Sequence, residues 1–308
     1  MIICASRRTD IPAFHPRWMM ARLREGSCLV RNPVSRTSLL RVDLSRRNVD
    51  CIVFMTKDPR PMEPYLREIG SMGHMYVFQV TLTPYGRAIE PGVPFKADIS
   101  DCCARIAERI GRDRMVWRYD PVLYGKGMDV AYHERKFRMM CREASRWTDR
   151  CVFSFVDMYG MASKAGDLYR GPTAAEADAF LRMASETARE NEMTLSCCCP
   201  RRDLSSYGIQ RRGCIDAAMM RSLDVPYETL DTPVRDECLC VRAIDIGEYD
   251  TCGHDCAYCY ANRSTPAERR TRLYCDDSEL LWGAVMPRDR IVDSHGRDSF
   301  RLDDFRFH

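Results

Sequence analysis

The sequence predicts an α/β fold that closes into a TIM-type (β/α) barrel, and two observations lead to this prediction. Short apolar runs alternate with longer amphipathic segments along most of the chain, which implies a parallel sheet with right-handed helical crossovers. Roughly eight strands over roughly 250 residues suit a closed barrel better than an open, doubly wound sheet. No Gly-x-Gly-x-x-Gly segment follows a predicted strand, which weakens the alternative of a dinucleotide-binding fold.

The predicted strands are short runs rich in Ile, Val, Phe and Cys. Two of them, separated by the turn-forming pair Asn32-Pro33, are expected to form a hairpin or an inserted strand. In chain order the predicted strands are Ile2–Ala5, Ser27–Val30, Leu39–Val42, Cys51–Met55, Met75–Thr83, Arg114–Tyr119, Cys151–Val156, Met193–Cys198 and Cys240–Ile246.

The predicted helices lie between these strands, where apolar residues recur at helical spacing. The last helix is expected to begin after Thr173 as its N-cap, with Glu176 three residues on in the capping-box position. The predicted helices are His15–Glu25, Pro61–Met72, Ala97–Ile110, Tyr132–Trp147 and Thr173–Glu192.

The chain is predicted to consist of a barrel domain over residues 1–250 and a C-terminal part over residues 251–308. The C-terminal part begins with a cysteine-rich motif and becomes charge-rich beyond Asn262, with one apolar patch at Leu280–Met286. We therefore expect a cluster loop followed by a tail that packs on the barrel.

The composition is that of a globular protein with an unusual number of cysteines. The 308 residues carry a net charge of +3, which offers little field for nucleic acid, and no apolar stretch is long enough to cross a membrane. The chain contains 17 cysteines, which is an odd number. Its first residues do not have the pattern of a signal peptide. From these features we expect a cytoplasmic protein whose cysteines are reduced, metal-bound or buried rather than joined in disulfides.

The main motif is the segment Cys252-Gly-His-Asp-Cys256-Ala-Tyr-Cys259, with the spacing C-x3-C-x2-C. A [4Fe–4S] cube takes one thiolate per iron, so three cysteines of one loop leave one iron open. The motif resembles the signature of the radical S-adenosylmethionine (SAM) superfamily, including the aromatic Tyr258 before the third cysteine. That resemblance implies that SAM binds the open iron, and that Tyr258 packs against adenine or shields the cluster. The alternative is a zinc site that adds His254 or a distant fourth ligand.

A second metal site is predicted from cysteines upstream of this motif. Cys198 ends a predicted strand, Cys214 follows a glycine, and Cys238 and Cys240 form a C-x-C pair. Four thiolates from separate segments can hold a second [4Fe–4S] cluster or a zinc ion. Core packing without any metal is the alternative, because cysteine is often buried. Cys197 and Cys199 are expected to point away from Cys198 if the strand continues.

Charged residues follow several predicted strands, and the carboxyl ends of barrel strands converge at one mouth. Guanidinium groups there can recognise an anionic group, such as the SAM carboxylate or a substrate phosphate. Structural ion pairs that stabilise the barrel are the alternative. The candidates are Arg7, Arg8, Asp10, Lys57, Arg118, Asp120 and Asp157.

Four segments together resemble a bacterial and archaeal family of domains of unknown function with a C-terminal cysteine cluster like that of radical SAM enzymes. They are Ser6-Arg-Arg-Thr-Asp-Ile-Pro12, Ile52-Val-Phe-Met-Thr-Lys-Asp-Pro59, Val116-Trp-Arg-Tyr-Asp-Pro121 and Asp245-Ile-Gly-Glu-Tyr249. The resemblance runs from about Met1 to Ala261, and it implies a barrel-like domain with an iron–sulfur cluster but no particular substrate.

The position of the motif separates this chain from ordinary radical SAM enzymes, in which the cysteine loop follows the first barrel strand. Here it follows the last predicted strand, which would make the chain a circularly permuted relative. No Gly-Gly-Glu segment follows the motif. We therefore carry two hypotheses: a radical SAM-like enzyme with an unknown substrate and an external electron donor such as a ferredoxin or flavodoxin, or an iron–sulfur or zinc protein without SAM chemistry. The second would act in electron transfer, in redox sensing or as a binding module.

Overall fold

The structure is a computed structural model that describes residues 1–158, 168–200, 202–230, 238–264 and 274–294. It shows a mixed α/β fold with an eight-stranded sheet in the order β10-β1-β4-β5-β6-β7-β8-β9. The strand pairs with a defined register in this sheet are parallel. The α/β prediction is thereby confirmed. Within the described residues β10 and β9 are the ends of the sheet, and its closure into a barrel is not shown.

The chain divides into two compact units. Unit 1 comprises residues 1–78, 215–253 and 261–308, and unit 2 comprises residues 79–214 and 254–260. Strand β5 (Tyr76–Thr81) contributes residues to both units. The predicted division into residues 1–250 and 251–308 stays a prediction.

Unit 1 is built around β1, an entirely buried strand that pairs on both sides. Residues Ile2 to Ala5 align with Cys51 to Phe54 of β4, and Ile3 aligns with Ile244 of β10. The main elements of this unit are β1 (Ile2–Ala5), α1 (Ile11–Phe14), α2 (Pro16–Glu25), β4 (Cys51–Thr56), η1 (Glu63–Tyr65), α3 (Leu66–Ser71), α8 (Ala217–Ser222) and β10 (Ile244–Asp245).

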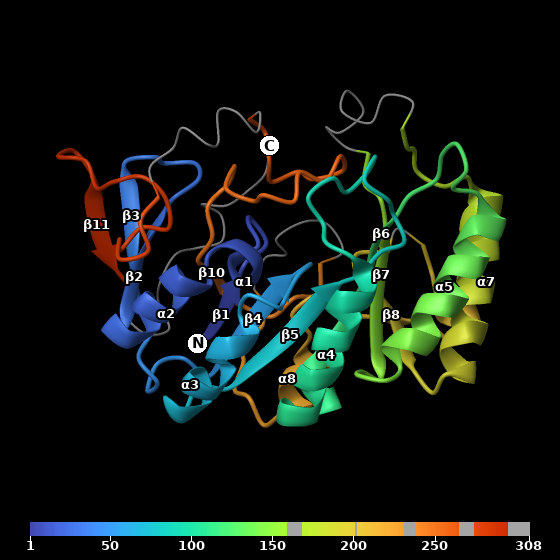
Figure 1. The fold of residues 1–308 in the computed structure, drawn as a ribbon, viewed down its shortest axis with the longest axis horizontal. Helices are drawn as coiled ribbons and strands as arrows, with labels where there is room; N and C mark the ends of the chain where they lie inside the picture. The colour runs from blue at the N-terminus through green and yellow to red at the C-terminus, as the bar shows by residue number, and fades with distance from the viewer. Residues whose placement is uncertain (159–167, 201, 231–237, 265–273, 295–308) are drawn as a thin grey trace. The chain divides into compact units, whose positions relative to one another are not determined.

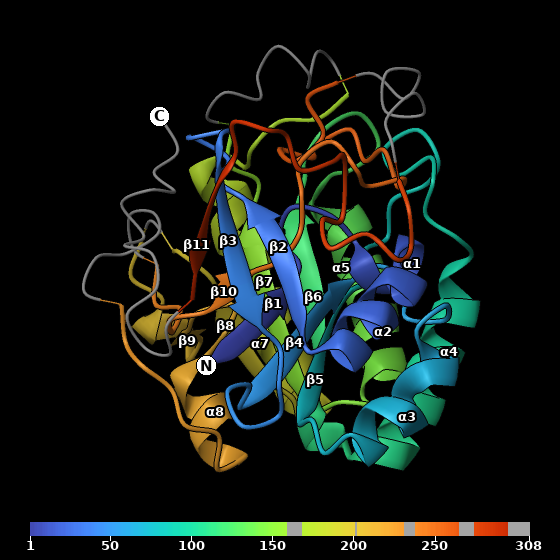
Figure 2. The same ribbon diagram turned by 90° about the vertical axis from the view of Figure 1, so that its left-hand side faces the viewer.

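A second, three-stranded sheet of unit 1 has the order β11-β3-β2 and faces the viewer in Figure 2. The predicted hairpin is confirmed, because β2 (Ser27–Arg31) pairs antiparallel with β3 (Ser38–Asp43). Strand β11 (Arg290–Asp293), which the sequence analysis missed, pairs parallel with β3. The described part of the tail packs here, since Leu280 joins Leu29 and Leu39 in an apolar cluster.

Unit 2 has parallel strands covered by long amphipathic helices. Helices α5 and α7 pack side by side (Figure 1). Their buried residues Phe137 and Phe180 stack on Trp117 and Tyr119 of β6, so a layer of aromatic rings forms the core. The elements are α4 (Lys96–Ile110), η2 (Arg112–Arg114), β6 (Met115–Val122), α5 (Val130–Ala144), β7 (Arg150–Phe155), α7 (Ala174–Glu190), β8 (Thr194–Cys197), η3 (Ser205–Tyr207) and β9 (Gln210–Arg211).

The start of α7 confirms the predicted capping box. Glu176 N–H donates to Thr173 Oγ1 over 3.3 Å, and Thr173 N–H donates to Glu176 Oε2 over 2.8 Å. These two bonds satisfy N–H groups that have no partner within the helix. Both guanidinium amines of Arg170 reach the same carboxylate at 2.7 Å, which fixes the chain entering the helix.

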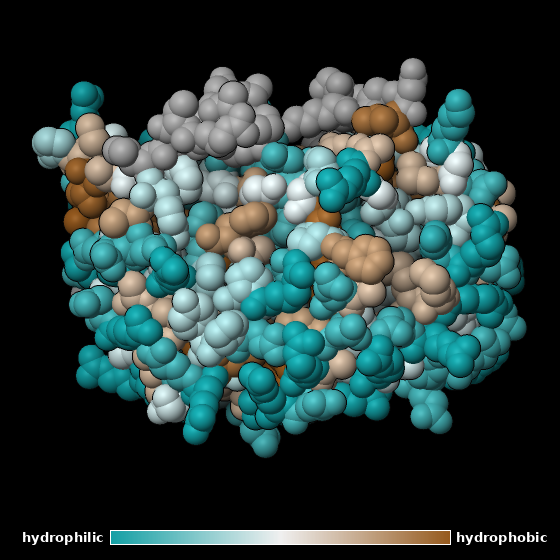
Figure 3. Space-filling model, in the orientation of Figure 1, coloured by the Kyte–Doolittle hydropathy of each residue, from teal (hydrophilic) through white to brown (hydrophobic). Residues whose placement is uncertain are grey.

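The surface is mostly polar, with a few exposed apolar side chains. Strand β11 leaves Ile291 and Val292 exposed, and Figure 3 shows an apolar area where Figure 1 draws this strand. No helix in the described ranges is both long and apolar enough to cross a membrane. Cysteines that lie apart from both predicted metal sites are mostly buried: Cys4, Cys28, Cys51, Cys102, Cys103, Cys141 and Cys151 are buried, whereas Cys275 is exposed.

Candidate functional site

The three cysteines of the motif lie in one loop that contributes to both units. Cys252 belongs to unit 1, and Cys256 and Cys259 belong to unit 2. All three are partly exposed, and Cys259 N–H donates to Cys256 O over 3.0 Å in a tight turn. A cluster that binds a small molecule or accepts electrons must be partly exposed, as these cysteines are. Three thiols on one short loop are also a suitable donor set for a [4Fe–4S] cluster.

In unit 2 the backbone of this loop is docked on residues 89–92. Gly92 N–H donates to His254 O over 3.0 Å, and Ala257 N–H donates to Ile89 O over 2.8 Å. The His254 ring nitrogen Nδ1 lies 3.2 Å from Gly92 O, so the backbone carbonyl occupies that nitrogen. These three contacts bracket Cys256 on both sides and fix the path of the chain through it.

Tyr258 points into the protein and binds a buried carboxylate. Its hydroxyl donates to Glu90 Oε1 over 2.5 Å, and its ring lies 6.3 Å from that of Tyr85. Burial, followed by the charge of Glu90, raises the pKa of Tyr258 well above its ordinary value, so the phenol stays a proton donor. In the described structure Tyr258 therefore supports the cysteine turn from inside, and its predicted contact with adenine stays a prediction.

In unit 1 the residues around Cys252 are held with similar firmness. Asn262 Nδ2 donates to Cys252 O over 2.8 Å, and Asp250 N–H donates to Ala261 O over 3.0 Å. A Cβ atom on Gly253 would lie 2.8 Å from the ring of Phe14, so only glycine allows this close packing. The chain before and after Cys252 is thus fixed by side chains of its own unit.

His15, which directly precedes helix α2, is buried beside this segment. Its ring lies 4.9 Å from that of Tyr274 and 6.1 Å from that of Trp282, both in the tail. Burial lowers its pKa to about 4, although the nearby backbone of Thr251 and the charge of Asp10 act in the opposite direction. The imidazole is therefore neutral at neutral pH.

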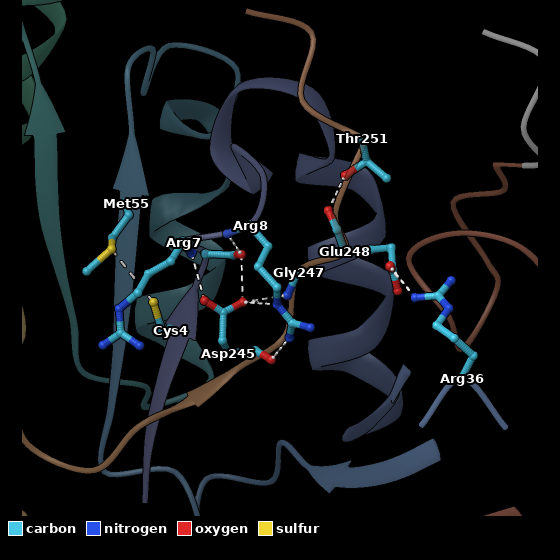
Figure 4. A network of polar contacts seen from close by, with 10 residues as sticks. Cys4, Arg7, Arg8, Arg36, Met55, Asp245, Gly247, Glu248 and Thr251 are labelled. Atoms are coloured by element: carbon cyan, nitrogen blue, oxygen red, sulfur yellow. Dashed lines mark hydrogen bonds and ion pairs between the residues drawn. The ribbon is translucent and has the colours of Figure 1, made fainter. Parts of the chain in front are cut away.

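The carboxylate of Asp245, at the end of β10, organises the residues that follow β1 (Figure 4). It accepts Ser6 Oγ and the backbone N–H of Arg7 over 2.7 Å each, and the backbone N–H of Gly247 over 3.0 Å. The Arg8 guanidinium forms an ion pair with it at 3.2 Å. Burial would raise the pKa of Asp245, but the charges of Arg8 and Arg7 outweigh burial and lower it. Asp245 was not among the predicted site residues.

Asp10 and Lys57, two of the predicted mouth residues, also meet in unit 1. Asp10 caps α1 by accepting Ala13 N–H over 3.0 Å, and its other oxygen accepts the backbone N–H of Lys57 over 2.6 Å. Both are buried. Asp10 thus ties the segment after β1 to the segment after β4, which is a structural role for this carboxylate.

In unit 2 a largely buried polar cluster lies on the strands β5, β6 and β7. Arg118 forms an ion pair with Asp120 and donates to Gln79 Oε1 over 3.1 Å, while Ser154 Oγ donates to Asp120. Burial acts to lower the pKa of Arg118, but Cys214 and Asp120 raise it well above its ordinary value. Arg118 and Asp120 thus form an ion pair within β6, whereas Asp157 is exposed in the segment after β7.

The predicted second cysteine set is also distributed over both units. In unit 2 the Sγ atom of Cys198 lies 3.2 Å from Sγ of Cys214 and 3.7 Å from Sγ of Cys199. Strand β8 ends at Cys197, and Cys199 adopts a left-handed φ of 49°, so the strand does not continue and the condition for Cys199 to point away from Cys198 is not met. Cys238 and Cys240 belong to unit 1.

Metal binding itself stays a prediction for both sets. Among the residues that the structure describes, no group of three or more His, Cys, Asp or Glu side chains is arranged so that it could hold a metal ion. The donor chemistry suits iron or zinc, because thiolates are preferred ligands of both.

Comparison with known proteins gives a family and no nearer relative. The family model described as Domain of unknown function (DUF1848) matches residues 2–261. The chain belongs to this family. The match confirms the family of domains of unknown function that was expected from the four sequence segments, and it ends two residues after Cys259. The cysteine cluster expected for that family stays a prediction. Among curated proteins and among solved structures, the searches found no match to the chain.

Proposed function

We propose that this DUF1848 chain is a radical SAM-like iron–sulfur enzyme, in which Cys252, Cys256 and Cys259 hold a [4Fe–4S] cluster with one iron open to SAM. The fixed backbone around Cys256, bonded to Ile89 and Gly92, is the observation that carries the proposal. A prearranged loop lowers the entropy cost of cluster binding. When bound, such a cluster supplies the electron that cleaves SAM reductively to a 5′-deoxyadenosyl radical.

In this proposal the residues of the chain bind, orient and exclude water. Arg7, Arg8 and Lys57 in unit 1 are candidates for an anionic group of SAM or substrate, with Asp10 beside them. Arg118, Asp120 and Asp157 are the corresponding candidates in unit 2. The substrate is unknown, and an external donor such as a ferredoxin or flavodoxin supplies the electron. Closure of the sheet into a circularly permuted barrel and a cytoplasmic location belong to the same proposal.

A second metal site is proposed at Cys198, Cys214, Cys238 and Cys240, holding a further [4Fe–4S] cluster or a zinc ion. The 3.2 Å approach of the Cys198 and Cys214 thiols supports it, because two ligands of one metal must lie next to each other. The guanidinium of Arg118 beside Cys214 favours the thiolate form that a metal requires. Cys199 is an additional candidate ligand at 3.7 Å from Cys198.

Anaerobic reconstitution followed by iron, sulfide and zinc analysis tests the metal sites, and detection of 5′-deoxyadenosine after reduction with SAM tests the chemistry. Cys256→Ser should remove one cluster, and Cys198→Ser should remove the second metal. Cys275→Ser is the matched control, because this exposed cysteine lies outside both sets and should leave the metal content unchanged. Reduced, cluster-loaded protein that yields no 5′-deoxyadenosine would contradict the SAM part of the proposal.

The alternative of an iron–sulfur or zinc protein without SAM chemistry has one observation in its favour. No Gly-Gly-Glu segment, which helps to hold the amino group of SAM, follows the motif. Zinc without sulfide would point to a structural or sensing role. A cluster whose electron paramagnetic resonance (EPR) spectrum does not change on addition of SAM would point to electron transfer.

A further inference from the structure

Glu90 is a buried carboxylate that lies far from the cysteine motif in the sequence and next to it in unit 2. Its side chain is fully buried, and it follows Thr83 in the loop between β5 and α4. Burying a carboxylate is costly unless charged and hydrogen-bonded partners surround it. The contacts of Glu90 must therefore offset the cost of burying its carboxylate.

Three donors converge on this carboxylate. Thr83 Oγ1 donates to Oε1 over 2.6 Å, Tyr258 donates to the same oxygen over 2.5 Å, and the Lys96 ammonium pairs with Oε2. Lys96 is the first residue of α4, so the network joins that helix to the cysteine turn. All of these residues belong to unit 2.

The backbone next to Glu90 binds the same turn. Ile89 O accepts Ala257 N–H, and Gly92 N–H donates to His254 O, so the residues on either side of Glu90 hold the residues on either side of Cys256. The hydroxyl of Tyr258 adds a side-chain bond two residues after Cys256 and one before Cys259. The loop is thus attached to Ile89, Glu90 and Gly92, and among these three residues Glu90 provides a charged side chain.

We propose that Glu90 is a positioning residue, which sets the geometry of the Cys256–Cys259 turn through Tyr258 and ties it to α4 through Lys96. The inference rests on the proposed function in that the positioned thiols are taken to bind a cluster. Partners outside the ligand shell commonly orient metal ligands in this way. The attachment itself exists without any metal and can be tested in the metal-free chain.

Hydrogen–deuterium exchange of residues 252–260 in metal-free protein gives the first test. Glu90→Gln and Tyr258→Phe should each speed exchange at Ala257 by about tenfold, because local opening then costs less. The double variant should exceed the larger single effect at Ala257 only slightly, since both changes weaken the same bond between Tyr258 and Glu90. Tyr132→Phe is the matched control: it removes a tyrosine hydrogen bond to Pro84 O in the same apolar cluster without touching the cysteine loop.

Cluster-loaded protein gives the second test. The two variants, but not Tyr132→Phe, should lose iron to a chelator several-fold faster and should show a changed EPR spectrum of the reduced cluster. Exchange at Ala257 that stays at the wild-type rate in both variants would overturn the role of Glu90. A wild-type chain that binds no cluster would overturn the proposed function, while the exchange result would still decide on Glu90.

Discussion

Ser6 and Asp245 lie 239 residues apart in the chain, and the hydroxyl of Ser6 donates to the Asp245 carboxylate over 2.7 Å. This bond joins the end of β1 to the end of β10, and the ion pair between Arg8 and the same carboxylate is also buried. The network accounts for two of the family segments at once, Ser6–Pro12 and Asp245–Tyr249. Its residues therefore stabilise the fold of unit 1.

Asp245→Asn should destabilise the protein by about 2–4 kcal/mol, because Arg8 loses its charge partner and an amide group faces several donors. The folded-state pKa of Asp245 lies below its ordinary value, so its contribution is present above the unfolded pKa of about 3.9 and is lost as the pH falls through the folded value. Urea unfolding from pH 7 to pH 3 measures both effects. Glu68→Gln, which breaks the exposed pair with Arg24, is the control and should leave the unfolding midpoint nearly unchanged, because solvent screens that pair. Equal losses for the two variants would contradict the prediction.

Gly247→Ala should destabilise unit 1 by about 1–3 kcal/mol through overpacking. A Cβ atom at this position would lie 2.7 Å from Ser6 Cβ and 3.2 Å from Thr9 Cγ2, within the network around Asp245. Gly70→Ala is the control, because nothing lies within 4 Å of a Cβ there and the residue sits in α3. That change should stabilise by about 0.5–1 kcal/mol, and thermal unfolding of both variants distinguishes the two signs. A neutral Gly247→Ala would show that Ser6 can move.

The elements that sequence reasoning predicted best are those whose own residues determine them. Strand β1 is an apolar run bounded by a charged segment, and α7 has a capping box and a continuous apolar face. Strands β9 and β11 were missed because one is only two residues long and the other lies in a charge-rich tail. Their pairing depends on neighbours that are distant in the sequence, and no local pattern reports it.

The same distinction applies to the candidate site. The spacing of Cys252, Cys256 and Cys259 is local and was found directly, whereas Glu90 lies before Pro91-Gly92 and looks like part of an ordinary turn. Its significance comes from Tyr258, which is 168 residues away. Asp245 was overlooked for the same reason, since one acidic residue after an apolar run gives no sign of its partners.

His15 should make the stability of the protein depend on pH in a mildly acidic range. Its pKa is lowered to about 4 by burial, against an unfolded value of about 6.5, so the unfolded chain binds the proton first. Stability is therefore complete above about pH 6.5 and decreases towards pH 4, by about 3 kcal/mol in total. His15→Phe keeps an aromatic ring against Tyr274 and Trp282 and should flatten this dependence in urea unfolding at pH 7.5 and pH 5. His133→Phe is the comparison, because that histidine is also buried with a lowered pKa but lies in unit 2. Unchanged pH dependence in His15→Phe would contradict the assignment.

Thr173→Ala should cost about 1 kcal/mol, because it leaves the N–H of Glu176 without its capping partner. Hydrogen bonds from Arg170, then the backbone of Thr173, lower the pKa of Glu176 to about 2 against the opposing effect of burial. The stabilisation from Glu176 is thus present above pH 4.5 and is lost as the pH falls towards 2. Thr194→Ala, at the exposed start of β8, serves as the control. Circular dichroism during urea unfolding at pH 7 measures the difference, and equal midpoints for the two variants would show that the box adds nothing.

Arg118→Met should destabilise unit 2 by about 3–5 kcal/mol, because the Asp120 carboxylate, which also accepts a hydrogen bond from Ser154, loses its ion-pair partner in a largely buried position. Replacing both members of the pair, as Arg118→Met with Asp120→Leu, should recover at least half of that loss, since no isolated charge remains. The four proteins of this double-mutant cycle can be compared by urea unfolding at one pH. Additive losses would mean that the two side chains do not act as a pair.

The same variants also report on the neighbouring thiols: if Arg118 favours the thiolate of Cys214, Arg118→Met should lower the metal content of the second site even where the protein remains folded.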